Sequence, residues 1–351
     1  MTGPSAVAPP APVLVIGANG YLGSHVTRRL VADGHRVRVM VRDGANTVGI
    51  DDLDVTRFVG DIWDDEVVRS AMTGCEVVYY CVVDTRGWLR DPAPLFRTNV
   101  DGTRNVLDIA VEPAVAAGLK KFVFTSSYVT VGRRRGTVAT EADVLGDREL
   151  TRLTPYVRSR VQAENLVMAY AREQGLPAVA MCVSTTYGAG DWGRTPHGAI
   201  IAGAAYGKLP FVMSGIELEA VGVDDAAAAL VLAAEKGRVG ERYLISEKMI
   251  SNAEVVRIAA EAAGVPAPTR SIPLPLSYAM AALGSVKARL QGTDERLSLG
   301  SLRLMRAEAP VDCSKARDEL GWRPGPVEES IREAAKFWVG LRRAKQARVT
   351  G

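Results

Sequence analysis

A tyrosine and an arginine stand four residues apart in the stretch "TPYVRSRVQAEN", at Tyr156 and Arg160. If the stretch is helical, four residues correspond to about one turn and a rise of about 6 Å, so the two side chains share a face. A fixed positive charge lowers the pKa of a nearby phenol from about 10, which prepares the phenol for proton transfer. Arginine can also hold ligand hydroxyl groups, but it stays charged and cannot relay protons. The pair is therefore a candidate proton-transfer site.

Other interpretations of the same stretch stay open. Arg160 could pair with Glu164 on the next turn, although an exposed pair of this kind is worth only about 0.3–0.5 kcal/mol. Tyr156 could be a core residue at the start of a helix. In that case the protein would bind a cofactor, or sense it, without catalysing a reaction.

A glycine-rich segment, "GANGYLG", places Gly17, Gly20 and Gly23 at intervals of three residues. It lies between the apolar run "VLVIG" and a segment whose apolar residues recur at helical spacing. A glycine turn lets the backbone approach a pyrophosphate, and the N-terminus of the next helix favours negative charge. Because the spacing opens the first strand–helix unit of the chain, it predicts a dinucleotide-binding loop.

The end of the following strand predicts which dinucleotide binds. "VRVMV" is followed by Arg42, whose guanidinium suits the 2′-phosphate of NADP(H), so we expect NADP(H) to be preferred. NAD(H) remains possible, with Arg42 in solvent and Asp43 on the ribose. Asp61, after the third strand, could accept from the adenine amino group or cap a helix that begins near Trp63.

Apolar runs alternate with helical patterns from residue 13 to about residue 184. Strands are expected at 13–17, 36–43, 55–61, 75–83, 120–127 and 177–184. Their nearly continuous apolar character is typical of a parallel sheet that helices bury on both faces, so the predicted fold is a doubly wound α/β Rossmann fold. Pro113 is expected to break or kink the helix that contains it.

The predicted domain organisation has three parts. Residues 1–12 form a disordered tail, and 13–184 form the dinucleotide-binding domain, to which 221–246 are expected to return. Residues 185–345 form mainly a smaller substrate-binding lobe. Asp224, in "VGVDDAA", is expected to cap the alanine-rich helix that follows it.

Composition and charge exclude several function classes. The net charge of +3 over 351 residues is too small to indicate nucleic acid or a membrane surface as a partner. The four cysteines are scattered, which is typical of reduced thiols in the cytoplasm, and three histidines make a histidine-rich metal site improbable. We therefore expect no metal, no membrane span and a cytoplasmic protein, without a signal peptide at the N-terminus.

Several motifs occur together in a family-specific order: the glycine loop, "GDIWD", "NVDGTRNVL", "FVFTSS", "YVRSRVQAE" and "VGVDDAA". From about residue 13 to about residue 340 the chain resembles the extended short-chain dehydrogenase/reductases. "STTYGAGDWGRTPHG" and "GRVGERYLIS" are most similar to the dihydroflavonol-reductase-like and 3β-hydroxysteroid-dehydrogenase-like branch. That branch also includes proteins labelled as hopanoid-associated sugar epimerases. The resemblance implies a nicotinamide cofactor and makes a homodimer possible.

The resemblance also assigns roles to residues. Ser127 and Tyr156 match the catalytic serine and tyrosine, Asn99 matches a supporting asparagine, and Arg160 replaces the family's lysine. A second departure is Cys182-Val183, where the family usually has Arg-Pro or Asn-Pro. The implied cofactor contacts are Gly17, Asn19, Gly20, Tyr21, Leu22, Gly23, Arg42, Asp61, Ile62, Cys81, Val82, Tyr156, Arg160, Val183 and Thr185. Ser127 could instead serve only a turn, and Asn99 only a helix N-cap.

The substrate side carries fewer signals. The segment 274–305 is rich in leucine and methionine, which suits either ordinary core or a lid over an apolar small molecule. Trp88 and Trp192 follow strands and could line the same opening, and Arg133–Arg135 could rim it or form a solvated turn. We expect an NADP(H)-dependent carbonyl reductase or alcohol dehydrogenase acting on an apolar, polycyclic or aryl substrate. A non-catalytic dinucleotide-binding protein and a nucleotide-sugar epimerase or dehydratase are the alternatives.

Overall fold

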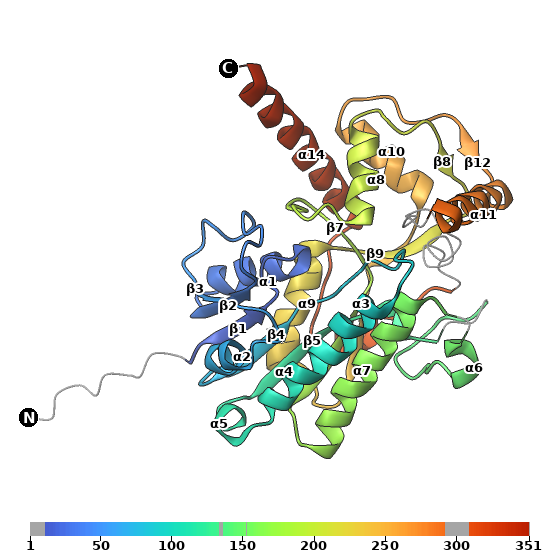
Figure 1. Cartoon of the computed structure of the whole chain (residues 1–351). Helices are drawn as coiled ribbons and strands as arrows, with labels where there is room; N and C mark the ends of the chain where they lie inside the picture. The colour runs from blue at the N-terminus through green and yellow to red at the C-terminus, as the bar shows by residue number, and fades with distance from the viewer. Residues whose placement is uncertain (1–10, 133–135, 152, 292–308, 351) are drawn as a thin grey trace, which may run out of the picture.

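A parallel sheet forms the centre of the computed structural model, which describes residues 11–132, 136–151, 153–291 and 309–350 (Figure 1). Seven strands lie in the order β10-β6-β5-β4-β1-β2-β3, and each neighbouring pair is parallel. They are β1 (Val13–Ile16), β2 (Val37–Val41), β3 (Thr56–Val59), β4 (Val77–Tyr80), β5 (Lys121–Ser127), β6 (Ala178–Val183) and β10 (Arg242–Ile245). The inner strands are mainly apolar, and many of their residues are β-branched or aromatic, which suits a pleated surface buried on both sides.

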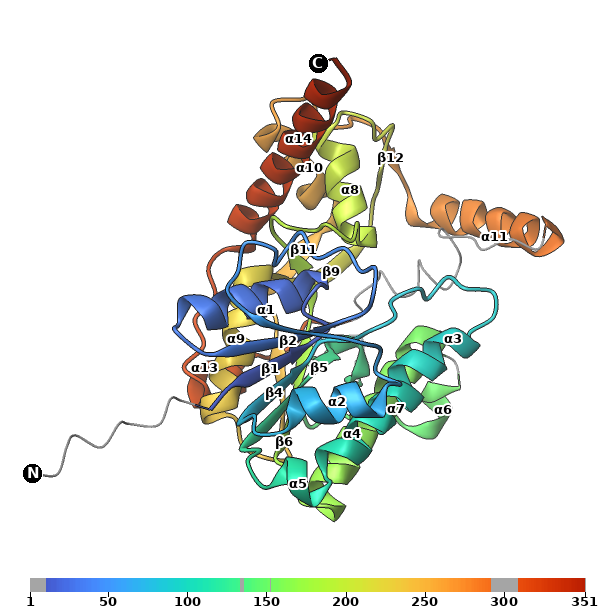
Figure 2. The same ribbon diagram turned by 60° about the vertical axis from the view of Figure 1, so that its left-hand side comes forward.

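Helices cover both faces of this sheet. α1 and α9 pack against each other on one face, while α2, α4 and α7 lie over the other (Figures 1 and 2). Their bounds are α1 (Tyr21–Ala32), α2 (Asp65–Met72), α4 (Gly102–Ala110), α7 (Pro155–Glu173) and α9 (Val223–Lys236). The predicted doubly wound parallel sheet is confirmed.

Two strands and one helix differ from the sequence expectation. β3 and β4 are shorter than the predicted runs 55–61 and 75–83. β3 is the mostly exposed edge of the sheet, and the chain after β4 leaves the sheet as the loop that carries Cys81 to Asp84. The helix containing Pro113 is split, because α4 ends at Ala110 and α5 (Pro113–Ala116) starts with the proline at its first position, where its missing N–H has no cost.

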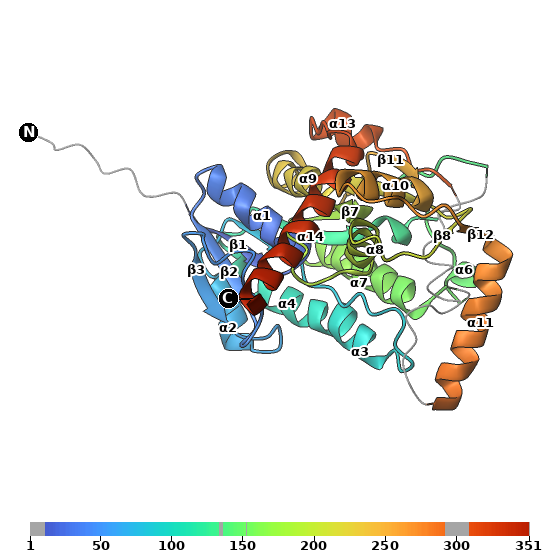
Figure 3. The same ribbon diagram turned by 90° about the horizontal axis from the view of Figure 1, so that it is seen from above.

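A second set of elements lies beyond the carboxyl edge of the main sheet. A small sheet in the order β11-β9-β7 and the pair β12-β8 are surrounded by helices α8, α10 and α14, which pack on one another (Figure 3). These elements are β7 (Thr185–Tyr187), β8 (Val212–Met213), β9 (Glu217–Gly222), β11 (Lys248–Ser251), β12 (Ser271–Ile272), α8 (Pro196–Ala205), α10 (Asn252–Ala262), α11 (Leu274–Gln291) and α14 (Val327–Thr350). Helix α13 (Ser314–Glu319) lies apart from this set and packs against β10 of the main sheet. The chain enters this set directly from β6, through Ser184 into β7. Of the helices described, none has the length and apolar character needed to cross a membrane.

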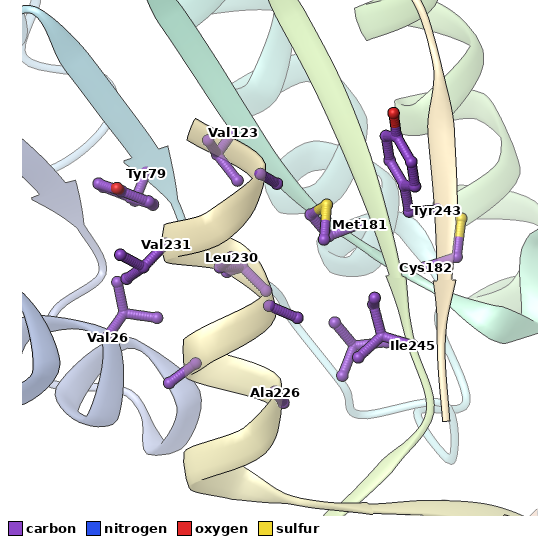
Figure 4. Close-up of a cluster of buried hydrophobic side chains, with 14 of the residues drawn as sticks. Val26, Tyr79, Val123, Met181, Cys182, Ala226, Leu230, Val231, Tyr243 and Ile245 are labelled. Carbon is purple, nitrogen blue, oxygen red and sulfur yellow. The ribbon is translucent and has the colours of Figure 1, made fainter. Parts of the chain in front are cut away.

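One hydrophobic cluster ties the first helix to the middle of the sheet. Leu230 and Val231 of α9 lie between Val26 of α1 and the strand residues Val123 and Met181 (Figure 4). Burying an aliphatic side chain of this size stabilises the fold by about 1.5–3 kcal/mol. The packing therefore fixes α1, and the glycine turn that precedes it, relative to β5 and β6.

Candidate cofactor and proton-transfer site

The glycine turn is packed so tightly that side chains are excluded. Gly17 has a φ of 84°, and a Cβ there would lie 3.0–3.1 Å from atoms of Cys81 and Val82. A Cβ on Gly23 would lie 2.2 Å from the Gly17 carbonyl oxygen. Gly20 is the N-cap of α1 and has no side chain that could accept from the first N–H groups of the helix. These N–H groups are therefore left for a ligand. This geometry fits a pyrophosphate.

The residues expected at the adenosine end lie at the carboxyl ends of β2 and β3. Arg42 directly follows β2 and its side chain is exposed, where a ligand phosphate could reach it. Asp61 does not cap a helix near Trp63; it accepts from the Trp63 backbone N–H at 3.3 Å. Helix α2 begins later and is capped by Asp64, so the capping alternative for Asp61 is wrong.

Tyr156 stands in the first turn of α7. Thr154 caps this helix by accepting from the Val157 N–H, and Pro155 occupies the first helical position. Burial raises the pKa of Tyr156, against the opposing effects of the Arg160 charge and a hydrogen bond with Ser127. The net direction is upward, so the expectation of a lowered phenol pKa is not met in the protein alone. A raised pKa keeps the phenol protonated, as a proton donor requires.

Arg160 turns into the protein and not toward Glu164. Its side chain is 1 % exposed, and its Nη2 donates to the carbonyl oxygen of Thr125 in β5. The guanidinium lies 5.2 Å from the ring centre of Phe124. Nε and Nη1 are buried and have no hydrogen-bond partner among the described residues. The alternative of an exposed Arg160–Glu164 pair is therefore wrong, and the two unpartnered donors fit the hydroxyl groups of a ribose.

Asn99 joins the loop after β4 to helix α7. Its side chain is fully buried in a π-helical turn (Arg97–Asp101), so it is not a helix N-cap. Its amide accepts from the Asp84 N–H at 2.7 Å and donates to the Asp84 carbonyl and the Ser159 hydroxyl, each at 3.0 Å. Ser159 in turn donates to the Tyr156 carbonyl oxygen at 2.8 Å. The asparagine thus fixes the start of α7 against the loop.

Ser127 is the last residue of β5 and precedes a 3-10 turn (Tyr128–Thr130). Its hydroxyl accepts from the Val129 N–H at 3.5 Å, which is the turn role considered above, and it also contributes to the pKa of Tyr156. The structure therefore brings Ser127, Tyr156, Arg160 and Asn99 together at the carboxyl edge of the sheet, on the side of the glycine turn. Among the described residues, no group of histidine, cysteine, aspartate and glutamate side chains could hold a metal ion.

A buried acid in the same region was missed by the sequence analysis. Asp84 is 8 % exposed and forms an ion pair with Arg86 at 2.6 Å. Although burial raises its pKa, the hydrogen bonds and charge of Arg86, with the charge of Arg42, hold it below the ordinary value. Its position just beyond a strand end was the available signal. The carboxylate opposes ionisation of Tyr156.

Other expected residues lie elsewhere or serve other contacts. Asp224 does not cap α9, whose N-cap is Gly222; instead it accepts from Nδ1 of His25 at 2.6 Å. Trp192 packs edge-on against Phe337 at 4.9 Å between ring centres. Arg133–Arg135 and residues 292–305 lie outside the described residues. The other implied cofactor contacts are Asn19, Leu22, Tyr21, Ile62, Val183 and Thr185, and they remain predictions.

The sheet, the glycine turn and the Ser–Tyr–cation group define a dinucleotide-dependent enzyme of the extended short-chain dehydrogenase/reductase class. A family model, the NAD dependent epimerase/dehydratase family, matches residues 13–246, and the chain belongs to this family. It is 29% identical to sterol demethylase protein B of Methylococcus capsulatus, covering 93% of this chain and 97% of that protein. It is 27% identical to a 2-alkyl-3-oxoalkanoate reductase of Shewanella oneidensis, and the match covers 88% of this chain and 81% of that protein.

Solved structures share this fold. The crystal structure of gox2253 superposes with a TM-score of 0.82 and 30% identity, over 95% of this chain and 99% of that one. A UDP-glucose 4-epimerase of Thermotoga maritima superposes with a TM-score of 0.74 at 21% identity, over 94% of this chain and 99% of that one. This likeness shows the shared fold. The chain is thus similar to a protein named as a reductase, and it shares its fold with one named as a sugar-nucleotide epimerase.

Proposed function

We propose that the protein is an NADP(H)-dependent carbonyl reductase or alcohol dehydrogenase that acts on an apolar small molecule. The observation that carries the proposal is the group at the start of α7. Burial raises the pKa of Tyr156, the Ser127 hydroxyl and the Arg160 charge oppose this rise, and the buried guanidinium of Arg160 lies one helical turn away. This is the arrangement needed to give a proton to a carbonyl oxygen and to stabilise the charge that develops on it.

Cofactor binding is assigned to three sets of residues. Gly17, Gly20 and Gly23 would hold the pyrophosphate, Arg42 a 2′-phosphate, and the free donors of Arg160 the ribose next to the nicotinamide. When bound in its reduced form, the cofactor supplies a hydride to the substrate carbon. Arg160 then contributes binding and a fixed positive charge, but no proton.

The proton steps belong to the side chains. Ser127 hydrogen-bonds the substrate oxygen and orients it toward the phenol of Tyr156. Tyr156 donates its proton as the carbonyl carbon is reduced, and the nearby guanidinium of Arg160 stabilises the phenolate that remains. Because Arg160 does not release a proton, the phenol is reprotonated from water.

An apolar substrate is supported by the second set of elements. Helix α11 exposes Leu276, Met280 and Leu283 at helical spacing, and it contains no acidic residue. Relatives named as a 2-alkyl-3-oxoalkanoate reductase and a sterol demethylase protein are consistent with alkyl or polycyclic substrates. A homodimer remains part of the proposal from family resemblance.

The test is cofactor oxidation with a panel of substrates. Purified protein is mixed with NADPH or NADH and with alkyl, aryl and polycyclic ketones, and the loss of the reduced cofactor is followed. Turnover of an apolar ketone, faster with NADPH, is the expected result. Cofactor binding without oxidation across the panel would overturn the proposal in favour of a non-catalytic protein.

A nucleotide-sugar epimerase is the second candidate, favoured by the fold shared with the UDP-glucose 4-epimerase. Supplying UDP-glucose and dTDP-glucose and separating the sugar products discriminates between the two. A new sugar nucleotide formed without net cofactor oxidation would support this candidate over the reductase.

A further inference from the structure

A buried carboxylate lies directly beneath the candidate site. Glu164 of α7 is 3 % exposed, and every contact of its carboxylate is with another element. Oε2 accepts from the Ser126 hydroxyl, from the Thr130 hydroxyl at 2.8 Å and from the Cys182 thiol at 3.3 Å. Oε1 accepts from Nη1 of Arg242 at 2.9 Å. Burying a carboxylate to this extent is costly unless it has such hydrogen-bond and charge partners.

The donors surround the serine of the candidate site. Ser126 precedes Ser127 at the end of β5, and Thr130 closes the turn that follows it. Glu164 therefore binds the chain on both sides of Ser127. It does so from the helix that carries Tyr156, two turns from that residue, so one rigid element determines the positions of both side chains.

Arg242 links Glu164 to the loop that contains Glu141 and Asp143. Besides its bond to Glu164, the guanidinium donates from Nε to the Glu141 carbonyl at 2.7 Å and from Nη2 to the Asp143 carbonyl at 2.9 Å. Its side chain is 16 % exposed and that of Glu164 is 4 % exposed, so the pair is shielded from solvent and salt. Residues 141–143 are thereby attached to β10 and to the serine turn.

We propose that Glu164, held by Arg242, is a positioning residue that sets the Ser127 hydroxyl against the Tyr156 phenol. The inference rests on the proposed reductase function, because turnover is one of its readouts. What matters is the hydrogen-bond acceptor at Oε2, which both sides of the serine turn share. The charge of Glu164 serves mainly to balance Arg242.

A matched pair of double variants separates acceptor from charge. E164Q/R242M and E164M/R242M both remove the ion pair, but only the first keeps an oxygen that can accept from Ser126 and Thr130. We expect E164M/R242M to have a kcat about 10- to 100-fold below that of E164Q/R242M, the scale for misplacing a reacting group by about 1 Å. KM and the affinity for NADPH should stay similar in the two.

The pH profile is a readout that a merely structural role would not move. The Ser127 hydrogen bond lowers the pKa of Tyr156, so its loss in E164M/R242M should move the inflection of the activity profile to higher pH. Val167→Ala serves as the control, because Val167 is buried about one turn further along the same helix and packs in a different core cluster, without polar contact to the Glu164 carboxylate. It should lower the melting temperature without moving the inflection.

Two further measurements keep the inference testable by itself. If a double variant does not fold, Ser126→Ala removes one donor to Oε2 of Glu164, and the Ser126 hydroxyl donates to no other residue described. It should lower kcat and move the inflection to higher pH. If no ketone is turned over, the titration of Tyr156 can be followed by near-ultraviolet absorbance, as the difference from Tyr156→Phe. If the phenol of Tyr156 titrates at higher pH in E164M/R242M than in E164Q/R242M, the positioning role is supported even though the reductase proposal has failed. Equal kcat and equal inflections in the two double variants, or a kcat loss in Val167→Ala as large as that in E164M/R242M, would overturn it.

Discussion

Arg160 donates to the carbonyl oxygen of Thr125, two residues before Ser127 on the same strand. The cation that replaces the family's lysine is thereby anchored to the strand that ends at the candidate serine. Nη2 makes this bond, whereas Nε and Nη1 are buried and have no hydrogen-bond partner among the described residues. These two nitrogens are therefore free to bind a ligand. Arginine at this position is thus compatible with the role of holding a ribose, although it cannot relay a proton.

Substituting Arg160 by lysine should keep or raise the rate of ketone reduction. Lysine retains the positive charge and adds a group that can exchange a proton, so reprotonation of Tyr156 would become faster. Steady-state kcat with NADPH and the best ketone of the panel measures the effect. Arg160→Met is the matched control, and it should weaken both cofactor binding and rate. A lysine variant as inactive as the methionine variant would show that the guanidinium shape itself is required.

Tyr156→Phe should lower kcat about 100-fold or more, the usual scale for losing a positioned proton donor. The substitution removes only the hydroxyl, so the melting temperature and the affinity for NADPH should change little. Single-turnover oxidation of bound NADPH by the best ketone reports the step directly. If the rate is unchanged, the stretch 154–165 is scaffold and the catalytic assignment is wrong.

The sheet and the glycine turn could be predicted because they depend on local patterns. Apolar runs of strand length alternate with helical spacing, and a glycine loop at the first such junction has one well-known use. The long-range side-chain contacts could not be predicted from the sequence, because they join residues far apart in the chain. His25 and Asp224 are 199 positions apart, and Glu164 and Arg242 are 78 apart. The helix-cap alternative for Asn99 is wrong, and the sequence could not exclude it because no sequence pattern marks a π-helical turn.

Arg42 should determine preference for the phosphorylated cofactor. Its exposed guanidinium stands at the end of β2, where the 2′-phosphate would lie. Arg42→Ala should weaken NADPH binding by about tenfold or more, on the scale of a charge-assisted contact, and leave NADH binding nearly unchanged. Fluorescence titration of both cofactors with both proteins is the measurement. Equal affinities in the parent protein would remove the basis for the preference.

Gly23→Ala should abolish dinucleotide binding or the local fold of the turn. The added Cβ would stand 2.2 Å from the Gly17 carbonyl oxygen, a backbone atom that cannot rotate away. Gly193→Ala is the control, because a Cβ there meets nothing within 4 Å. Isothermal titration with NADPH and a thermal melt separate loss of binding from loss of folding. Parent-like affinity in Gly23→Ala would refute the assignment of this turn to the pyrophosphate.

His25 and Asp224 should make the free energy of unfolding depend on pH. The hydrogen bond from His25 lowers the pKa of Asp224, so the folded carboxyl loses its proton more readily than the unfolded one. This contribution is complete above the unfolded pKa of about 3.9 and is lost as pH falls through the lower folded pKa. The Asp224 side chain is 77 % exposed, so the effect should not exceed about 1 kcal/mol.

The measurement compares denaturant unfolding of the parent and of His25→Ala from about pH 6 downward, through the range in which carboxyl groups titrate. The stability difference should shrink as pH falls below about 4, leaving the part that comes from the bond of Nε2 to the Ala189 carbonyl at 3.2 Å and from the Tyr21 ring. When Asp224 is already replaced by asparagine, His25→Ala should change the free energy of unfolding by the same amount at every pH in this range. A constant difference in both backgrounds would mean that the ion pair contributes nothing to folding.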